Sequence, residues 1–134
     1  MQTPTLADGQ MMQQDLAEQY PHLAEMADGD PELMLDLLEM FLIQTPELMQ
    51  KLVEGLRPLE RSSVYTASHT LKPTLQYLGM DQLSDLARRI EEESRDETVR
   101  PDQLIEKSET LRDQLNVELS RIRKLVRRHR PSLF

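Results

Sequence analysis

One stretch of the sequence, ASHTLKPTLQYLG over residues 67–79, places a histidine and a lysine among small and apolar residues. A neutral imidazole carries a lone pair near neutral pH, so a histidine on a rigid support can act as a nucleophile. A lysine one helical turn further on would stabilise the oxygens of an arriving phosphoryl group. The pair His69 and Lys72 is therefore the first candidate for chemistry, although exposed histidines are common and the pair alone is a weak signal.

The helix expected over residues 62–78 decides which way His69 points. Spacings of three and four place six residues on one face, which we predict to be buried: Val64, Ala67, Ser68, Leu71, Leu75 and Leu78. His69 lies about 200° around the helix from Leu71, so we expect it to project into solvent. The residues that share this exposed side are Tyr65, Lys72, Pro73 and Gln76.

Apolar periodicity and helix-end signals predict five helices in total. The first is short and imperfect and follows a loose, flexible tail over residues 1–14; the second is long and continues through Pro46. We predict an all-α fold, in which residues 15–130 form an antiparallel four-helix bundle with a short extra N-terminal helix. The helices are expected at about residues 16–28, 30–57, 62–78, 81–94 and 101–129.

Composition narrows the class of protein. A chain of 134 residues is the size of one domain, and the absence of cysteine excludes disulfides and cysteine-based zinc sites. No apolar run approaches the roughly 20 residues that span a bilayer, and no signal-peptide pattern opens the chain, so we expect a cytoplasmic protein without membrane contact. The net charge of −8 argues against nucleic acid as a partner. Six basic residues and no acid occur in residues 119–134, and we expect them to balance the acidic helix over residues 30–57.

The wider context of the His–Lys pair resembles the signature of histidine phosphotransfer (Hpt) domains. That signature is a histidine, any residue, leucine, lysine and a small residue, with a Leu-Gly pair ending the helix. The residues that follow it here without a gap are His69, Leu71, Lys72, Leu78 and Gly79. Residues 20–52 and the segment MDQLSDLARRIEEESR resemble the neighbouring helices of the family, so the resemblance covers about residues 20–126.

The resemblance implies both a fold and a function. Such domains are four-helix bundles whose exposed histidine accepts a phosphoryl group from an aspartate of a receiver domain, or passes one on. By position, His69 would be the phosphorylated residue and Lys72 the cation beside it. The family implies a phosphoryl carrier rather than an enzyme, with no cofactor or metal of its own, because the receiver brings the Mg²⁺. The implied partners are response-regulator receiver domains and hybrid histidine kinases, and we expect a monomer. Two alternatives stay open for the chain: a free-standing protein, which we favour, and a domain excised from a larger kinase.

Glu91, on the following helix, falls where the family often has Gln or another polar residue that contacts the imidazole. If its carboxylate accepts the Nδ1 proton, the Nε2 lone pair faces solvent, ready for in-line attack. The same negative charge would repel a phosphoryl group. The alternative is that Glu91 belongs to a solvated charged face, since residues 91–93 are all glutamate.

Pro73 is the clearest departure from the family, most of which has glycine at this position. Proline removes the backbone hydrogen bond to the carbonyl of His69. Either the helix bends slightly at the histidine, or this chain is a degenerate relative that has lost a clear approach to it. We favour the first interpretation, because some relatives resemble this chain in having His-x-Leu-Lys-Pro.

Two other classes of function stay open. A helical scaffold could dock on a receiver or a kinase without being phosphorylated. A metal-dependent or hydrolytic enzyme has almost no support, because His22 and His129 share no short ligand spacing with another histidine.

Overall fold

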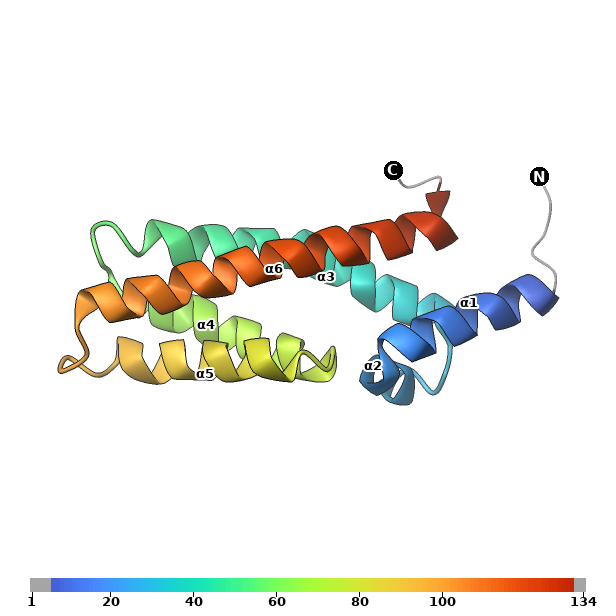
Figure 1. Cartoon of the computed structure of the whole chain (residues 1–134), viewed down its shortest axis with the longest axis horizontal. Coiled ribbons are helices and arrows are strands. Elements are labelled where there is room, and N and C mark those ends of the chain that lie inside the picture. The colour runs from blue at the N-terminus through green and yellow to red at the C-terminus, as the bar shows by residue number, and fades with distance from the viewer. Residues whose placement is uncertain (1–5, 132–134) are drawn as a thin grey trace.

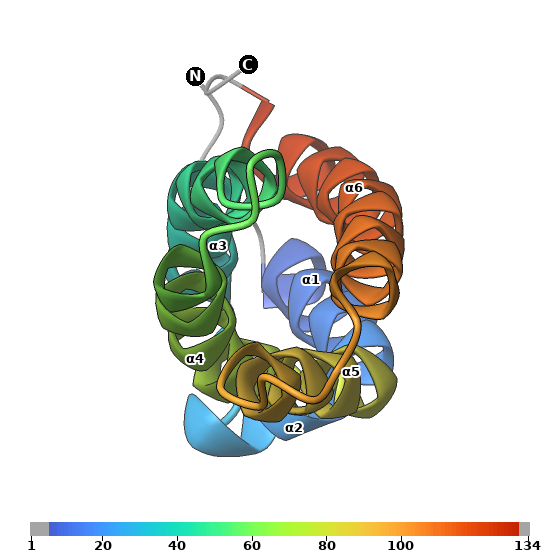
Figure 2. The same cartoon turned by 90° about the vertical axis from the view of Figure 1, so that its left-hand side faces the viewer.

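A computed structural model describes residues 6–131, and within this range the regular structure is all α-helical, with no strand. The helices are α1 (Leu6–Gln19), α2 (Pro21–Met26), α3 (Pro31–Glu54), α4 (Arg61–Tyr77), α5 (Asp81–Ser94) and α6 (Pro101–His129). Helices α3 to α6 alternate in direction and lie side by side in chain order around one axis (Figure 1, Figure 2). The predicted all-α fold, an antiparallel four-helix bundle, is confirmed.

The core is formed by the apolar stripes of α3 to α6, joined at one end by Leu16, Tyr20, Leu23 and Ala27 of the N-terminal segment. On α4, all six residues predicted to face inward are buried. On α6 the buried stripe repeats every three or four residues from Leu104 to Val126. Burial of the opposite face of α4 is what turns His69 outward.

Helix α3 begins where the sequence predicts and is one unbroken element. The Asp30 side chain accepts hydrogen bonds from the backbone N–H groups of Glu32 and Leu33, at 3.0 and 3.4 Å, and Pro31 occupies the first turn. The helix continues through Pro46 and ends at Glu54, about one turn before the predicted end.

The N-terminal segment is more ordered than predicted. The expectation of a loose tail over residues 1–14 is wrong from Leu6 onward, because α1 starts there; residues 1–5 lie outside the described residues. The side-chain amide of Gln13 donates a 2.7 Å hydrogen bond to the carbonyl of Gly29, which ties α1 to the turn before α3. The single helix expected at about residues 16–28 is two helices, since Pro21 cannot continue α1 and instead opens α2.

Helices α3 and α6 extend beyond α4 and α5, and α1 and α2 lie at this end of the molecule (Figure 1). Asp15 of α1 contacts Arg128 and His129 of α6, at 3.1 and 2.7 Å. The Arg130 guanidinium contacts three carboxylates of α3 at 2.7–2.8 Å: Glu32, Asp36 and Glu39. The expected balance between the basic C-terminal end and the acidic long helix is therefore present. No helix within residues 6–131 combines the length and the apolar character that crossing a membrane requires.

Candidate functional site

Helix α4 presents His69 on its outer face, with 57% of the side chain exposed. The residue before it, Ser68, is fully buried, and its hydroxyl donates to the carbonyls of Val64 and Tyr65 at 2.8 and 3.1 Å. Gly79 follows the end of the helix at φ 77°, a left-handed conformation that favours glycine. The histidine thus stands on a rigid helix whose inner face is buried and whose end is defined.

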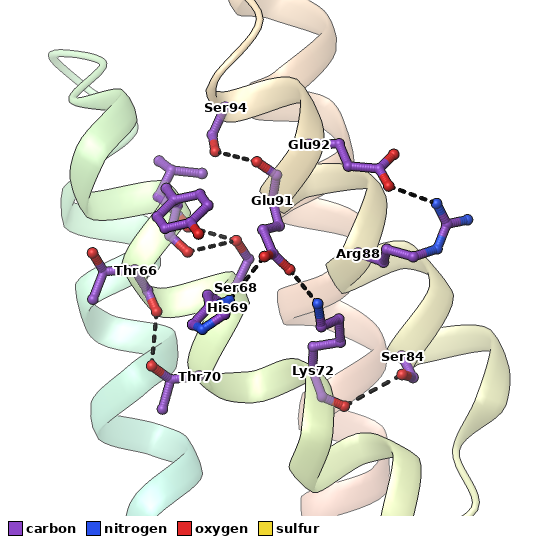
Figure 3. Close-up of polar contacts among 12 residues, drawn as sticks. Thr66, Ser68, His69, Thr70, Lys72, Ser84, Arg88, Glu91, Glu92 and Ser94 are labelled. Carbon is purple, nitrogen blue, oxygen red and sulfur yellow. Dashed lines mark hydrogen bonds and ion pairs between the residues drawn. The ribbon is translucent and has the colours of Figure 1, made fainter.

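Glu91 reaches across from α5 to the imidazole (Figure 3). Its Oε1 lies 2.8 Å from Nδ1 of His69, and only 13% of the side chain is exposed, whereas the next residue, Glu92, is exposed. Because a carboxylate only accepts, the proton of this pair sits on Nδ1, and the lone pair of a neutral imidazole is then on Nε2. The structure brings together the two residues that the sequence singled out on different helices.

Lys72 completes a bridge through the same carboxylate. Its Nζ lies 2.7 Å from Oε2 of Glu91, so Glu91 contacts His69 with one oxygen and Lys72 with the other. The lysine side chain is 29% exposed, less than the sequence predicts, because it turns toward α5 rather than into solvent. The hydrogen bond from Lys72 lowers the pKa of Glu91; burial acts against it, and the hydrogen bond from His69 lowers the pKa further. The carboxylate is therefore ionised at neutral pH, and the lysine cancels its charge.

The planar side chains of Tyr65 and Arg95 lie next to His69 in the site. The rings of Tyr65 and His69 are stacked, with centroids 5.5 Å apart and planes 13° from parallel. The guanidinium carbon of Arg95 lies 3.7 Å from the centroid of the Tyr65 ring. The sequence predicts Tyr65 beside the site but gives no sign of Arg95, which caps the C-terminal end of α5 one turn after Glu91.

Pro73 and Gln76 are exposed on α4 beyond His69, as predicted. Helix α4 continues through Pro73 to Tyr77, so the missing backbone donor does not end it. The Ser84 hydroxyl of α5 donates a 3.3 Å hydrogen bond to the carbonyl of Lys72, next to the proline. Both Pro73 and Gln76 line a groove of about 710 Å³ whose other wall includes His22.

The other two histidines lie far from His69 in the chain and have their own partners. Nδ1 of His22 is 3.9 Å from Glu25, and Nε2 of His129 is 2.7 Å from Asp15. Within residues 6–131 no group of three or more His, Asp or Glu side chains is arranged to hold a metal ion.

The sequence was compared with the models of known protein families, with curated proteins and with solved structures. The chain matches the sequence model of the Hpt domain over residues 36–125, more than half of its 134 residues. The chain belongs to the Hpt domain family. Members of this family are phosphocarrier modules that exchange phosphoryl groups with receiver domains and histidine kinases in phosphorelays. Neither the curated proteins nor the solved structures yielded a match.

The matched segment contains every residue of the site, whereas α1 and α2 lie outside it. The resemblance stated from the HTLKPTLQYLG motif is thereby confirmed at the level of the family.

Proposed function

We propose that this Hpt domain relays a phosphoryl group between receiver-domain aspartates through His69. The observation that supports the proposal best is the contact of Nδ1 with a mostly buried carboxylate, which leaves Nε2 as the nitrogen available to a partner. A single side chain, Glu91, thus selects the nucleophilic atom.

The transfer follows from that geometry. Nε2 attacks the phosphorus of the receiver's aspartyl phosphate; the N–P bond forms while the P–O bond breaks, and the aspartate leaves as a carboxylate. No base is needed at Nε2, because this nitrogen carries no proton. The ring keeps its Nδ1 proton and becomes positively charged, and Glu91 stabilises that charge by accepting the hydrogen bond. The reverse sequence returns the phosphoryl group to a receiver.

Lys72 has two parts in this proposal. It neutralises Glu91 across 2.7 Å, so the carboxylate can hold the Nδ1 proton without presenting a net negative charge to the phosphoryl group. Its ammonium group also stands one turn from His69, where it can stabilise the phosphoryl oxygens. The domain itself would need no cofactor, and the Mg²⁺ would belong to the receiver.

The receiver is proposed to dock on the His69 face of α4 together with part of α3. A groove of about 500 Å³ lies between these helices, and its lining includes Leu48 and Lys51 of α3 and, on α4, Thr66 and the residue that follows His69, Thr70. Chemical-shift mapping with a receiver should perturb both walls of this groove. Perturbations confined to the basic C-terminal end of α6 would contradict the proposed surface.

The test of the function is transfer from a receiver in the absence of ATP. A receiver domain is phosphorylated with acetyl phosphate, freed of the reagent and mixed with the Hpt domain. Phosphate that is labile in acid and stable in alkali should appear on His69 and return to fresh receiver. Labelling of a His69→Gln variant would refute the assignment.

The alternative function is a scaffold that docks on a receiver without being phosphorylated. It is supported by Pro73, the residue at which the motif departs from most of the family. The same experiment decides between the two functions. A wild-type domain that binds a phosphorylated receiver, but is not labelled by it, would be a docking module.

A further inference from the structure

The contacts of Tyr65 and Arg95 have no part in the chemistry described so far. Tyr65 precedes His69 by one turn, and their rings are stacked at 5.5 Å and 13°. Arg95 holds its guanidinium 3.7 Å from the centroid of the tyrosine ring, within the range of a cation–π contact. Three planar groups are therefore arranged in sequence, ending at the imidazole.

The antiparallel arrangement of α4 and α5 explains how this array forms. Tyr65 and His69 are one turn apart on α4, and Arg95, the residue that caps the C-terminal end of α5, is one turn from Glu91. Because the helices run in opposite directions, His69 meets Glu91 at one level and Tyr65 meets Arg95 at the next.

The contacts of Arg95 differ from those of the two arginines within α5. Arg88 and Arg89 form ion pairs with carboxylates of their own helix, mainly Asp85. Arg95 is exposed and forms no ion pair with any residue between 6 and 131, in a chain with 24 acidic residues. Its side chain is instead placed over the Tyr65 ring.

We propose that Tyr65 and Arg95 are positioning residues for His69: Tyr65 sets the plane of the imidazole, and Arg95 holds Tyr65 in place. A hydrogen bond at Nδ1 fixes one edge of the ring but leaves its tilt free. The stacked tyrosine restricts that tilt, so Nε2 points in one direction. For phosphoryl transfer this inference rests on the proposed function, whereas the geometry of the ring can be measured without a receiver.

The consequence for transfer is a matter of alignment. In-line attack requires the Nε2 lone pair to point at phosphorus, and a misplacement of about 1 Å can cost about a hundredfold in rate. The face of the tyrosine ring also favours the positive charge that develops on the imidazole during attack. Loss of the stack should therefore lower kcat and leave the KM for the receiver unchanged.

Four variants separate the elements of this proposal. Tyr65→Leu keeps apolar bulk but has no flat ring, and we expect kcat to fall about tenfold. Tyr65→Phe keeps the ring and loses only the hydroxyl, so kcat should stay within about twofold. Arg95→Ala should lower kcat about threefold to fivefold, and Arg95→Lys should recover part of it. Arg123→Ala, which removes an exposed arginine of α6, is the matched control.

The first measurement needs no receiver. Long-range ¹H–¹⁵N NMR spectra report the imidazole tautomer, and potassium phosphoramidate phosphorylates histidine directly, with an N–P bond formed as ammonia leaves. Wild type should show the Nδ1–H tautomer and react at Nε2. Tyr65→Leu should keep this tautomer and this site of reaction, because Glu91 sets both, but the imidazole ring should become more mobile: ¹³C relaxation should give lower order parameters for its C–H bonds, and Tyr65→Phe should keep the wild-type values. Unchanged order parameters of the imidazole in Tyr65→Leu would overturn the proposal.

The second measurement is transfer from a phosphorylated receiver over a range of receiver concentrations. A fall in kcat at constant KM for Tyr65→Leu, rescued in Tyr65→Phe, supports positioning; a change in KM alone would mean that Tyr65 is a docking contact and would overturn it. Thermal melting checks that each variant folds. If wild type reacts with phosphoramidate at Nε2 but with no receiver, the relay function fails while the positioning inference stands.

Discussion

The molecule contains two pairs of a histidine and a carboxylate that look alike in distance and differ in everything around them. On the α4–α5 face, His69 and Glu91 are 2.8 Å apart; at the end where α1 meets α6, His129 and Asp15 are 2.7 Å apart. The first histidine is 57% exposed and the second 14%. The contact itself does not make a histidine reactive.

The difference lies in which nitrogen the carboxylate contacts. Glu91 contacts Nδ1 of His69, the nitrogen nearer the backbone, so Nε2 has no contact with this carboxylate. Asp15 contacts Nε2 of His129, the outer nitrogen, and Arg128 donates a hydrogen bond to the same carboxylate oxygen. The first arrangement leaves Nε2 free for the proposed transfer, whereas the second joins α1 to α6.

Replacement of each histidine by glutamine should separate these roles most strongly. His69→Gln should abolish labelling by a phosphorylated receiver and change the free energy of unfolding by less than about 0.5 kcal/mol, because the side chain is exposed. His129→Gln is the control and should be labelled like wild type. The measurements are phosphate transfer and denaturant unfolding. Labelling of His69→Gln, or loss of labelling in His129→Gln, would contradict the roles assigned to the two histidines.

Lys72→Ala should slow transfer without eliminating it. A charge interaction at this distance is worth about 1 kcal/mol in water and a few once the receiver excludes solvent, which corresponds to roughly ten- to a hundredfold in rate. Stopped-flow transfer kinetics would measure the loss. Lys124→Ala, at an exposed lysine of α6, should transfer at the wild-type rate; equal losses in both variants would point to general charge rather than to this site.

Asp15→Asn should act on stability and leave transfer unchanged. The variant weakens the contacts with His129 and Arg128, and we expect the free energy of unfolding to fall by about 1 kcal/mol. Chemical denaturation followed by circular dichroism gives this value. A transfer rate that fell together with stability would show that the two ends of the molecule are coupled.

Acid should weaken both pairs, in a window set by their carboxylates. The pKa of Glu91 is lowered from its ordinary 4.5, chiefly by Lys72; burial alone would raise the pKa of Asp15 from 3.8, but His129, Gln19 and Arg128 lower it overall. Groups with a lowered folded pKa contribute stability that is complete above the ordinary pKa and is lost as pH falls through the folded one. The melting temperature should therefore decline below about pH 4.5.

Substitution with the matching amide tests this pH dependence. In Glu91→Gln and in Asp15→Asn the melting temperature should fall less steeply below about pH 4.5 than in wild type, because an amide does not titrate in this range. A decline as steep as that of wild type in both variants would assign acid sensitivity to other carboxylates.

Pro73→Gly should have the smallest effect. Glycine restores the backbone donor toward the His69 carbonyl, and its cost of about 1 kcal/mol relative to alanine is less than the penalty of about 3 kcal/mol for proline inside a helix. Transfer should stay within about threefold of wild type. Pro46→Gly, at the other proline inside a long helix, is the control; loss of transfer in Pro73→Gly alone would show that the proline itself is required.

Local pattern was enough to predict most of the bundle. Positions spaced three and four apart gave the buried face of α4 and hence the outward direction of His69, because the helical period fixes which residues share a side. Asp30, Pro31 and Gly79 marked helix ends, since capping depends on a few neighbouring residues. A short N-terminal helix was predicted, but not its start at Leu6, because the stability of α1 comes from contacts distant in sequence, such as those of Gln13 and Asp15.

In the site, too, some features follow from the sequence and others only from the tertiary structure. The sequence by itself determined that His69 is exposed, that Lys72 lies one turn away and that the motif belongs to the Hpt family. Only the tertiary structure decided that Glu91 bridges the histidine and the lysine, and that Arg95 covers Tyr65. Those contacts depend on the register between α4 and α5, which is set by how their buried faces interlock across the bundle rather than by the spacing within either helix.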